Sequence, residues 1–218
     1  MSSQLIRLRE VMDKLRSPGG CPWDAEQDHQ SLLKYLLEES YEFIEAIEEN
    51  DRIAMQEELG DLLLQVYFHS RIAEDDKNAP FNIEDVARTV ADKLERRHPH
   101  VFGDTQVKDS AEVLENWERQ KAVEKGRKSA IDGVPIAQPA LPLITKLLYR
   151  ANKLDYKLSI DKDLQISKDT NEDEFGKLML GIIAQAIELG IDPEAALRKT
   201  AKALISDIQA QEQGRINS

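Results

Sequence analysis

The sequence has little of several features that would each indicate a particular class of protein. It holds one cysteine, Cys21, in 218 residues, so an intramolecular disulfide and a zinc site built of thiolates are excluded. No apolar run approaches the length of a membrane span. The first residues form an amphipathic pattern with charges inside it, which is not typical of a signal peptide. A cytoplasmic location is therefore expected.

Positive charge is also scarce. The 29 Lys and Arg residues are outnumbered by 41 Asp and Glu, for a formal net charge of −12. Such a field opposes unspecific binding to DNA, RNA or an anionic membrane, so neither nucleic acid nor membrane is expected as a partner. A nucleotide is not excluded, because it can bind together with a metal ion. Hydrophobic residues make up 41% of the chain, which is enough for a packed core.

Signals for β-strands are rare, because few segments alternate apolar and polar residues. Helical periodicity dominates instead, and the expected fold class is an all-α helical bundle. Asn82 and Asp192 are predicted to cap the helices that follow them, and the stretch SPGGCPWD at 17–24 is predicted to be a break. The predicted helices span residues 3–16, 29–49, 51–74, 82–97, 109–126, 139–153, 172–189 and 193–212.

Two parts of the chain resemble one another. EELGDLLLQV at 57–66 resembles DEFGKLMLGI at 173–182, and IEDVARTVADKL at 83–94 resembles PEAALRKTAKAL at 193–204. The order and approximate spacing agree, so we predict a duplicated helical unit.

The second copy differs from the first in its acids. Lys177 stands where the first copy has Asp61, and no acidic helix precedes it. With the proline-rich stretch 132–142 as the boundary, the predicted domains are residues 1–131 and a degenerate second unit at 132–218. The second unit is predicted to support folding or dimerisation.

The acids are concentrated between Tyr35 and Phe68, among apolar residues at helical spacing. At about 100° per residue, two acid pairs border the apolar faces of two successive helices, which a short hinge makes antiparallel neighbours. Converging carboxylates repel unless one is protonated or a cation neutralises them, and hard divalent ions prefer oxygen ligands. The alternative is that all these acids form a solvated helix surface. The two pairs are Glu39 with Glu42 and Glu58 with Asp61.

These residues resemble a known family. EESYE followed by EELGD is similar to the EExxE and ExxD signature of the all-α nucleoside triphosphate pyrophosphohydrolases, and the chain more specifically resembles the MazG family. The likeness covers roughly residues 5–153. It is supported by GCPWDAEQ at 20–27, KLERRHPHVF at 93–102 and VLENWERQK at 113–121.

The resemblance implies hydrolysis of a nucleoside triphosphate between its α- and β-phosphates, with Mg²⁺ as cofactor and Mn²⁺ as a substitute. The implied metal ligands are Glu39, Glu42, Glu58 and Asp61. Glu38 is adjacent and would orient or deprotonate the attacking water, which makes Glu38 and Glu39 the candidate catalytic residues. The implied nucleotide-binding residues are Lys93, Arg96, Arg97, Trp117 and Lys121.

Several of these residues also have an ordinary structural interpretation. A helix C-terminus favours cations such as Arg96 without any ligand, and Trp117 is equally consistent with core packing. The histidines of the HPH turn, His98 and His100, could be ligands, but such a turn at a helix end is more often structural. Trp23 is predicted to anchor a loop packed near the nucleotide pocket.

The family commonly pairs its helices into dimers, so a homodimer is expected. Activity is predicted to reside in residues 1–126, because only the first unit keeps all four acids. The competing hypothesis is a non-catalytic nucleotide sensor or scaffold of the same fold. The base and sugar preference cannot be predicted from the sequence.

Overall fold

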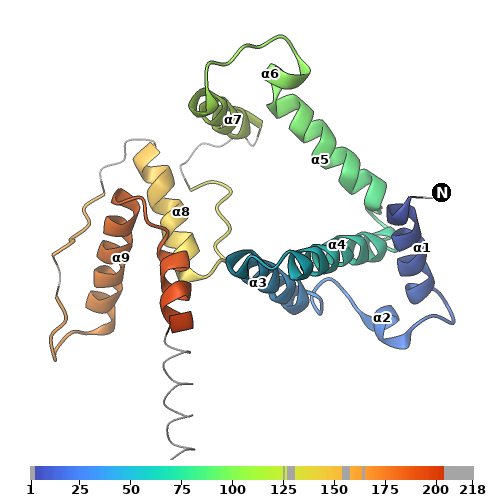
Figure 1. The fold of residues 1–218 in the computed structure, drawn as a ribbon, viewed down its shortest axis with the longest axis horizontal. Helices are drawn as coiled ribbons and strands as arrows, with labels where there is room; N and C mark the ends of the chain where they lie inside the picture. Colours follow the sequence, from blue (N-terminus) through green and yellow to red (C-terminus); the bar gives the residue numbers. More distant parts are fainter. Residues whose placement is uncertain (1–2, 125, 127–130, 154–157, 164, 204–218) are drawn as a thin grey trace, which may run out of the picture. The chain divides into compact units, whose positions relative to one another are not determined.

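The structure, a computed structural model, describes residues 3–124, 126, 131–153, 158–163 and 165–203. All regular elements in these residues are helices (Figure 1), which confirms the predicted all-α class. The chain divides into two compact units, Met1–Ser110 and Ala111–Ser218. This boundary falls earlier than the predicted one after residue 131.

The first unit begins with α1 and ends with two helices joined at His98. Its long helices lie within a few residues of their predicted positions, whereas the short helix α2 overlaps the break predicted at 17–24 and α6 falls in the HPH turn. The helices are α1 (Gln4–Arg16), α2 (Pro22–Glu26), α3 (Leu33–Glu49), α4 (Arg52–Glu74), α5 (Ile83–Arg97) and α6 (Pro99–Phe102).

Helix α3 begins at Leu33, four residues later than predicted. The cause is the side chain of Asp28, whose Oδ1 accepts hydrogen bonds from the backbone N–H groups of Gln30 (2.9 Å) and Ser31 (2.8 Å). An aspartate that binds nearby backbone in this way offers an alternative to the helix. Residues 29–32 are consequently turns.

A tight hinge joins α3 to α4. Asn50 ends α3 in the left-handed conformation, at φ 57°, which asparagine tolerates better than most residues. Asp51 then caps α4, accepting hydrogen bonds from the N–H groups of Ile53 and Ala54. The two helices therefore turn back on each other and pack as an antiparallel hairpin.

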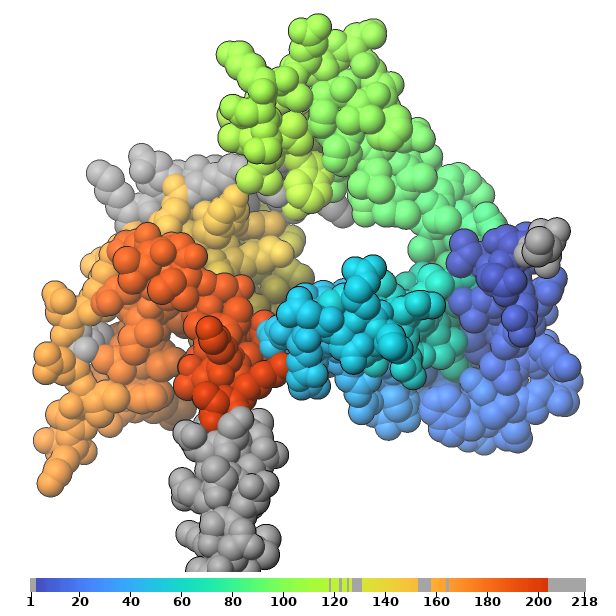
Figure 2. All heavy atoms as spheres, in the orientation of Figure 1, coloured from blue at the N-terminus to red at the C-terminus, as the bar shows by residue number. Residues whose placement is uncertain are grey.

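The core of the first unit lies between α1, the segment before α3, and α4. Met12, Leu32 and Phe68 are at most 3% exposed, and burying each such side chain contributes about 2 kcal/mol. The hydroxyl of Tyr67 donates to the carbonyl oxygen of Leu5 at 3.3 Å. In the space-filling view the blue surface of α1 and α2 adjoins that of the α3–α4 hairpin (Figure 2).

The second unit holds α7 (Ser110–Glu124), α8 (Ala140–Lys153) and α9 (Glu172–Glu188), followed by helical residues 193–203. Leu148, Ile183 and Ala184 form its core between α8 and α9. Asp192 accepts from the backbone of residues 194 and 195, so both predicted caps, Asn82 and Asp192, are confirmed. The predicted end of the last helix, at residue 212, lies outside the described residues.

Every helix in the described part of the chain is too short or too polar to cross a lipid bilayer. The resemblance between the two halves stays a prediction. Helix α9 contains the stretch that matches α4 in sequence, and Lys177, which replaces the acid, forms an ion pair with Asp173 at 2.6 Å. An i,i+4 pair of this kind supports an exposed helix.

Candidate metal centre

Three carboxylates converge between α3 and α4. Glu39 comes from α3, and Glu58 and Asp61 come from α4. One oxygen atom of each lies within 4.8 Å of the others, and all three side chains are half-buried. The spacing of three residues between Glu58 and Asp61 places both on one side of α4, so a single facing residue of α3 completes the group.

The two remaining acids of the EESYE motif lie at the edge of this cluster. Glu42 is exposed, and its charge acts on Glu58. Glu38 is also exposed, and its charge acts on Glu39. The pairs Glu39 with Asp61 and Glu42 with Glu58 therefore follow the antiparallel register of the hairpin.

Burial and mutual repulsion both disfavour the ionised form of the cluster. Burial raises the pKa of Glu39, and the charges of Asp61, Glu42, Glu58 and Glu38 raise it further. Burial also raises the pKa of Glu58, assisted chiefly by Glu42 and Asp61. A bound cation would reverse both effects, because it stabilises the charged form of each carboxylate.

The donor set fits a hard divalent cation. The Oε2 atom of Glu58 is buried and has no hydrogen-bond partner, and an unpaired buried carboxylate oxygen is costly unless a cation or donor satisfies it. All the converging atoms are carboxylate oxygens. Such ligands suit Mg²⁺ or Mn²⁺, whereas zinc and copper favour nitrogen and sulfur.

The predicted phosphate-binding residues lie on α5. Lys93 is half-buried, Arg96 is exposed, and Arg97 is 8% exposed. In Figure 1, α5 leaves the end of α4 and its last turn lies away from the α3–α4 hairpin. The described residues of one chain therefore do not bring these cations against the carboxylate cluster.

Trp117 and Lys121 lie on α7, which belongs to the second unit. The Nζ atom of Lys121 is 5.1 Å from the centroid of the Trp117 ring, close enough for a cation–π interaction. The indole Nε1 of Trp117 is buried without a hydrogen-bond partner. The role of these two residues in binding a nucleotide stays a prediction.

The GCPWD segment forms a tight turn and the start of α2. A Cβ atom at Gly20 would lie 2.3 Å from the carbonyl oxygen of Leu15, so only glycine fits. The ring of Trp23 meets that of Tyr35 edge-on at 5.8 Å while remaining 49% exposed. The ring of His98 hydrogen-bonds the carbonyl of Leu94 at 2.7 Å, which agrees with a structural role.

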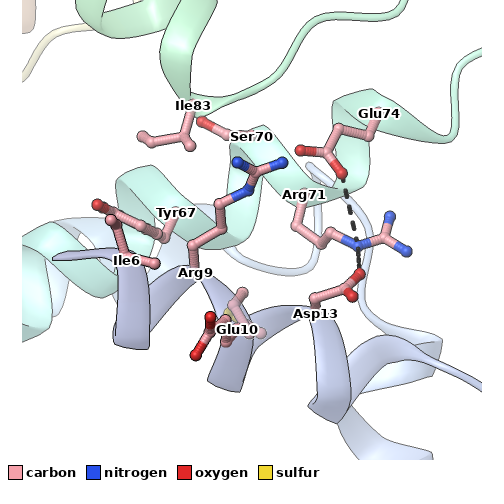
Figure 3. Close-up of a pocket in the computed structure, with 10 residues that line it drawn as sticks. Ile6, Arg9, Glu10, Asp13, Tyr67, Ser70, Arg71, Glu74 and Ile83 are labelled. Carbon is pink, nitrogen blue, oxygen red and sulfur yellow. Dashed lines mark hydrogen bonds and ion pairs between the residues drawn. The ribbon is translucent and has the colours of Figure 1, made fainter. Parts of the chain in front are cut away.

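A separate cavity of about 340 Å³ opens between α1, α4 and the start of α5 (Figure 3). Arg71 dominates one side of it, bound to Asp13 at 2.9 Å and approached by Glu74 at 3.7 Å. Arg71 thus forms ion pairs with acids of both α1 and α4. None of the predicted site residues lines this cavity, which separates it from the candidate metal centre.

Two polar residues absent from the sequence prediction continue the same face of α4. Gln65 and His69 follow Asp61 at intervals of four residues, and each has a buried polar atom without a hydrogen-bond partner. The spacing from Asp61 was the available signal, since residues four apart share a helix face.

An antiparallel helical hairpin with converging carboxylates defines an all-α protein with a candidate divalent-cation site. The model of the MazG nucleotide pyrophosphohydrolase domain matches residues 27–102, which include the whole cluster. Relatives that match this chain over most of its length are named MazG or nucleoside triphosphate pyrophosphohydrolase. The chain belongs to the MazG family.

The similarity extends well beyond the matched domain. The chain is 42% identical to the nucleoside triphosphate pyrophosphohydrolase/pyrophosphatase MazG of Thermotoga maritima, over 94% of this chain and 84% of that protein. It is 36% identical to the nucleoside triphosphate pyrophosphohydrolase of Escherichia coli, over 90% and 82%. The enzyme of that name from Mycobacterium tuberculosis is 48% identical over 69% of this chain and 45% of its own length.

Proposed function

We propose that the chain hydrolyses nucleoside triphosphates between the α- and β-phosphates, giving the monophosphate and pyrophosphate, with Mg²⁺ as cofactor and Mn²⁺ as a substitute. The observation that carries the proposal is the meeting of Glu39, Glu58 and Asp61 within 4.8 Å, with an unpartnered oxygen on Glu58. The names of the relatives agree with this activity.

The positions of the carboxylates indicate a different role for each. Glu39, Glu58 and Asp61 would hold the cation from inside the hairpin, and Glu42 would join them from the exposed edge beside Glu58. When bound there, Mg²⁺ would supply positive charge that offsets the phosphates and lowers the pKa of a water molecule. Glu38, exposed and next to this group, is the residue that would orient the attacking water or accept its proton.

The triphosphate needs further donors beyond the cation. Lys93, Arg96 and Arg97 occupy the last turns of α5, and the planar guanidinium of arginine suits phosphate oxygens. Trp117 offers an aromatic face for the base, with Lys121 beside it. These assignments rest on the sequence motifs.

We infer that two copies of the chain associate. Val90 and Leu94 project from α5 at 41% and 44% exposure, and Leu37 from α3 at 57%. The only fully buried residue of α5 is the charged Arg97, so the apolar stripe of this helix has little cover in one chain. A second copy would cover it, and sedimentation equilibrium tests the dimer directly.

Pyrophosphate release from the eight common nucleotides with Mg²⁺ tests the activity. Glu42→Ala and Asp61→Ala should each lower the rate at least about 100-fold, since each removes a metal ligand. Glu45→Ala, which changes an exposed acid on the same helix, is the matched control and should keep the wild-type rate. Wild-type rates in both ligand variants would refute the site. Tight nucleotide binding without product would indicate a sensor instead.

A further inference from the structure

A lysine in the first turn of α3 lies close to the carboxylate cluster along the helix. Lys34 is exposed, and it precedes the exposed acid Glu38 by one turn. Its ammonium group lies over the ring of Tyr35, with Nζ 4.6 Å from the ring centroid. Among the described residues no carboxylate pairs with it, even though Glu38 follows at the i,i+4 spacing of helical ion pairs. The positive charge of Lys34 is therefore open to a ligand.

The contact with Tyr35 turns the lysine toward the candidate metal centre. Successive helical residues are about 100° apart around the axis, so Tyr35 lies between the directions of Glu38 and Glu39. It precedes Glu39 by four residues, which places both on one side of α3 with a rise of about 6 Å between them. Helical side chains lean toward the N-terminus, so Glu39 leans toward the Tyr35 ring. An ammonium group held on that ring lies about one turn from the cluster.

The ring that carries the lysine is itself supported by two neighbours. Tyr35 is half-buried and packs against the core of the first unit. Trp23 of α2 meets it edge-on, with 5.8 Å between the ring centroids and 72° between the ring planes. The turn at Gly20, where a Cβ atom has no room, leads directly into α2. The GCPWD segment therefore supports the ring on which Lys34 lies.

Charge favours a phosphate group as the ligand of this lysine. A divalent cation at Glu39, Glu58 and Asp61 would be surrounded by carboxylates, which offset most of its charge. A triphosphate bound to such an ion needs further positive groups, because its own charge is large. The ammonium of lysine is a compact point charge that binds phosphate oxygens well. Lys34 meets this need from the helix that also carries Glu39.

We propose that Lys34 binds a phosphate group of the substrate beside the metal ion, and that Trp23 and Tyr35 hold its ammonium group in place. The assignment rests on the proposed function, which puts the triphosphate at the carboxylate cluster. Lys34 contacts the substrate, whereas Trp23 acts through Tyr35 and is a positioning residue. The GCPWD segment thereby gains a role in binding the substrate, in addition to its role in the fold.

Steady-state kinetics of the full-length protein with Mg²⁺ test the contact with the substrate. Lys34→Met keeps the length of the side chain without its charge. It should lower kcat/KM about tenfold for every nucleotide that is hydrolysed, because a charge-assisted hydrogen bond is lost. Lys34→Arg, which keeps the positive charge, should restore most of this loss. Lys77→Met removes the same charge from the exposed segment after α4 and should keep the wild-type value. An unchanged kcat/KM in Lys34→Met would overturn the proposal.

A double-variant cycle separates positioning by Trp23 from a general effect on the fold. Trp23 is 49% exposed, so Trp23→Leu removes little buried surface. It should lower kcat/KM several-fold in the wild-type background and cause no further loss in Lys34→Met, because both changes act on one contact. Equal losses in the two backgrounds would overturn the positioning role of Trp23.

A binding experiment separates this proposal from the proposed reaction. Inorganic triphosphate carries no base, so its affinity depends neither on base preference nor on nucleotide hydrolysis. Calorimetric titration with Mg²⁺ present should show about tenfold weaker binding to Lys34→Met than to the wild type, and high salt should reduce the difference. If no nucleotide is hydrolysed but this difference is found, the phosphate contact stands and the reaction fails. Equal affinities, or no binding to the wild type, would overturn the contact, and hydrolysis of nucleotides would then leave the reaction intact.

Discussion

His29 and His69 hydrogen-bond through their Nδ1 atoms at 2.7 Å across 40 residues of sequence. His29 belongs to the turn that precedes α3, and His69 to α4. The hydrogen bond therefore links the turn before α3 to α4, the second helix of the hairpin. Only one proton fits between the two nitrogens, so protonation of both rings breaks the contact.

The histidine pair predicts acid sensitivity. The folded-state pKa of His69 lies below its ordinary value, mainly through burial and then through His29. The stability that it contributes is thus complete above the ordinary histidine pKa of about 6.5 and is lost as pH falls below that value toward the lowered one. Urea unfolding at pH 8 and pH 5 should show weaker folding at pH 5.

The neighbouring charges determine the control for this prediction. Backbone hydrogen bonds lower the pKa of Asp28 and of Asp76, and the nearby His29 lowers both further, so these acids stay charged between pH 8 and pH 5 and add nothing to the slope. His69→Phe should therefore flatten the dependence of stability on pH between 8 and 5. His100→Phe, which changes a histidine of α6, should retain it. Equal slopes in wild type and His69→Phe would contradict the assignment.

Helix positions and the carboxylate pattern were predictable from the sequence because both follow helical periodicity. Glu39, Glu58 and Asp61 border apolar stripes, and a short hinge brings such borders together. Helix α2 was not predictable in this way. Pro22 occupies its first turn, and Arg16 donates to the carbonyl oxygens of Asp24 and Gln27, contacts made from outside the segment.

Helical periodicity also could not predict the contacts between residues that lie far apart in the sequence. The bond between His29 and His69 depends on the turn at Asp28, which delays α3. An apolar pocket beside Gln65 needs Phe81, from the segment before α5. The sequence around each residue does not indicate its partner, because the fold of the first unit brings the two residues together.

Repulsion within the carboxylate cluster predicts an unusual effect of neutralising one acid. Burial and neighbouring acids raise the pKa of Glu58, so its charged form opposes folding at neutral pH when no cation is bound. Glu58→Gln should raise the melting temperature in EDTA at pH 7. The same variant should lose most of the further rise that Mg²⁺ gives the wild type, since ligand-linked stabilisation needs the binding site.

The pH dependence of the metal-free protein checks the sign of this effect. A carboxyl group with a raised folded-state pKa contributes stability below its ordinary value, about 4.3 for glutamate, and that stability is lost as pH rises through the raised pKa. The difference in melting temperature between Glu58→Gln and wild type should therefore grow as pH rises toward 7. A difference that shrinks over this range would contradict repulsion as the cause.

Two glycines, Gly20 in the turn before α2 and Gly60 within α4, predict opposite effects of substitution by alanine. At Gly20 a Cβ atom would lie 2.3 Å from the carbonyl oxygens of Lys14 and Leu15. That contact is with backbone, and the adjacent N–H of Cys21 donates to the same Leu15 oxygen at 2.8 Å. Gly20→Ala must therefore displace the turn, and we expect a loss of about 2–3 kcal/mol in the free energy of unfolding.

Gly60 provides the matched control on α4. A Cβ atom there meets no atom within 4 Å, and the residue is exposed in the middle of a long helix. Gly60→Ala should stabilise the fold by about 0.5–1 kcal/mol, because alanine loses less backbone entropy than glycine in a helix. Urea unfolding of both variants measures the contrast. If Gly20→Ala is as stable as Gly60→Ala, the close approach of the GCPWD turn to the end of α1 is wrong.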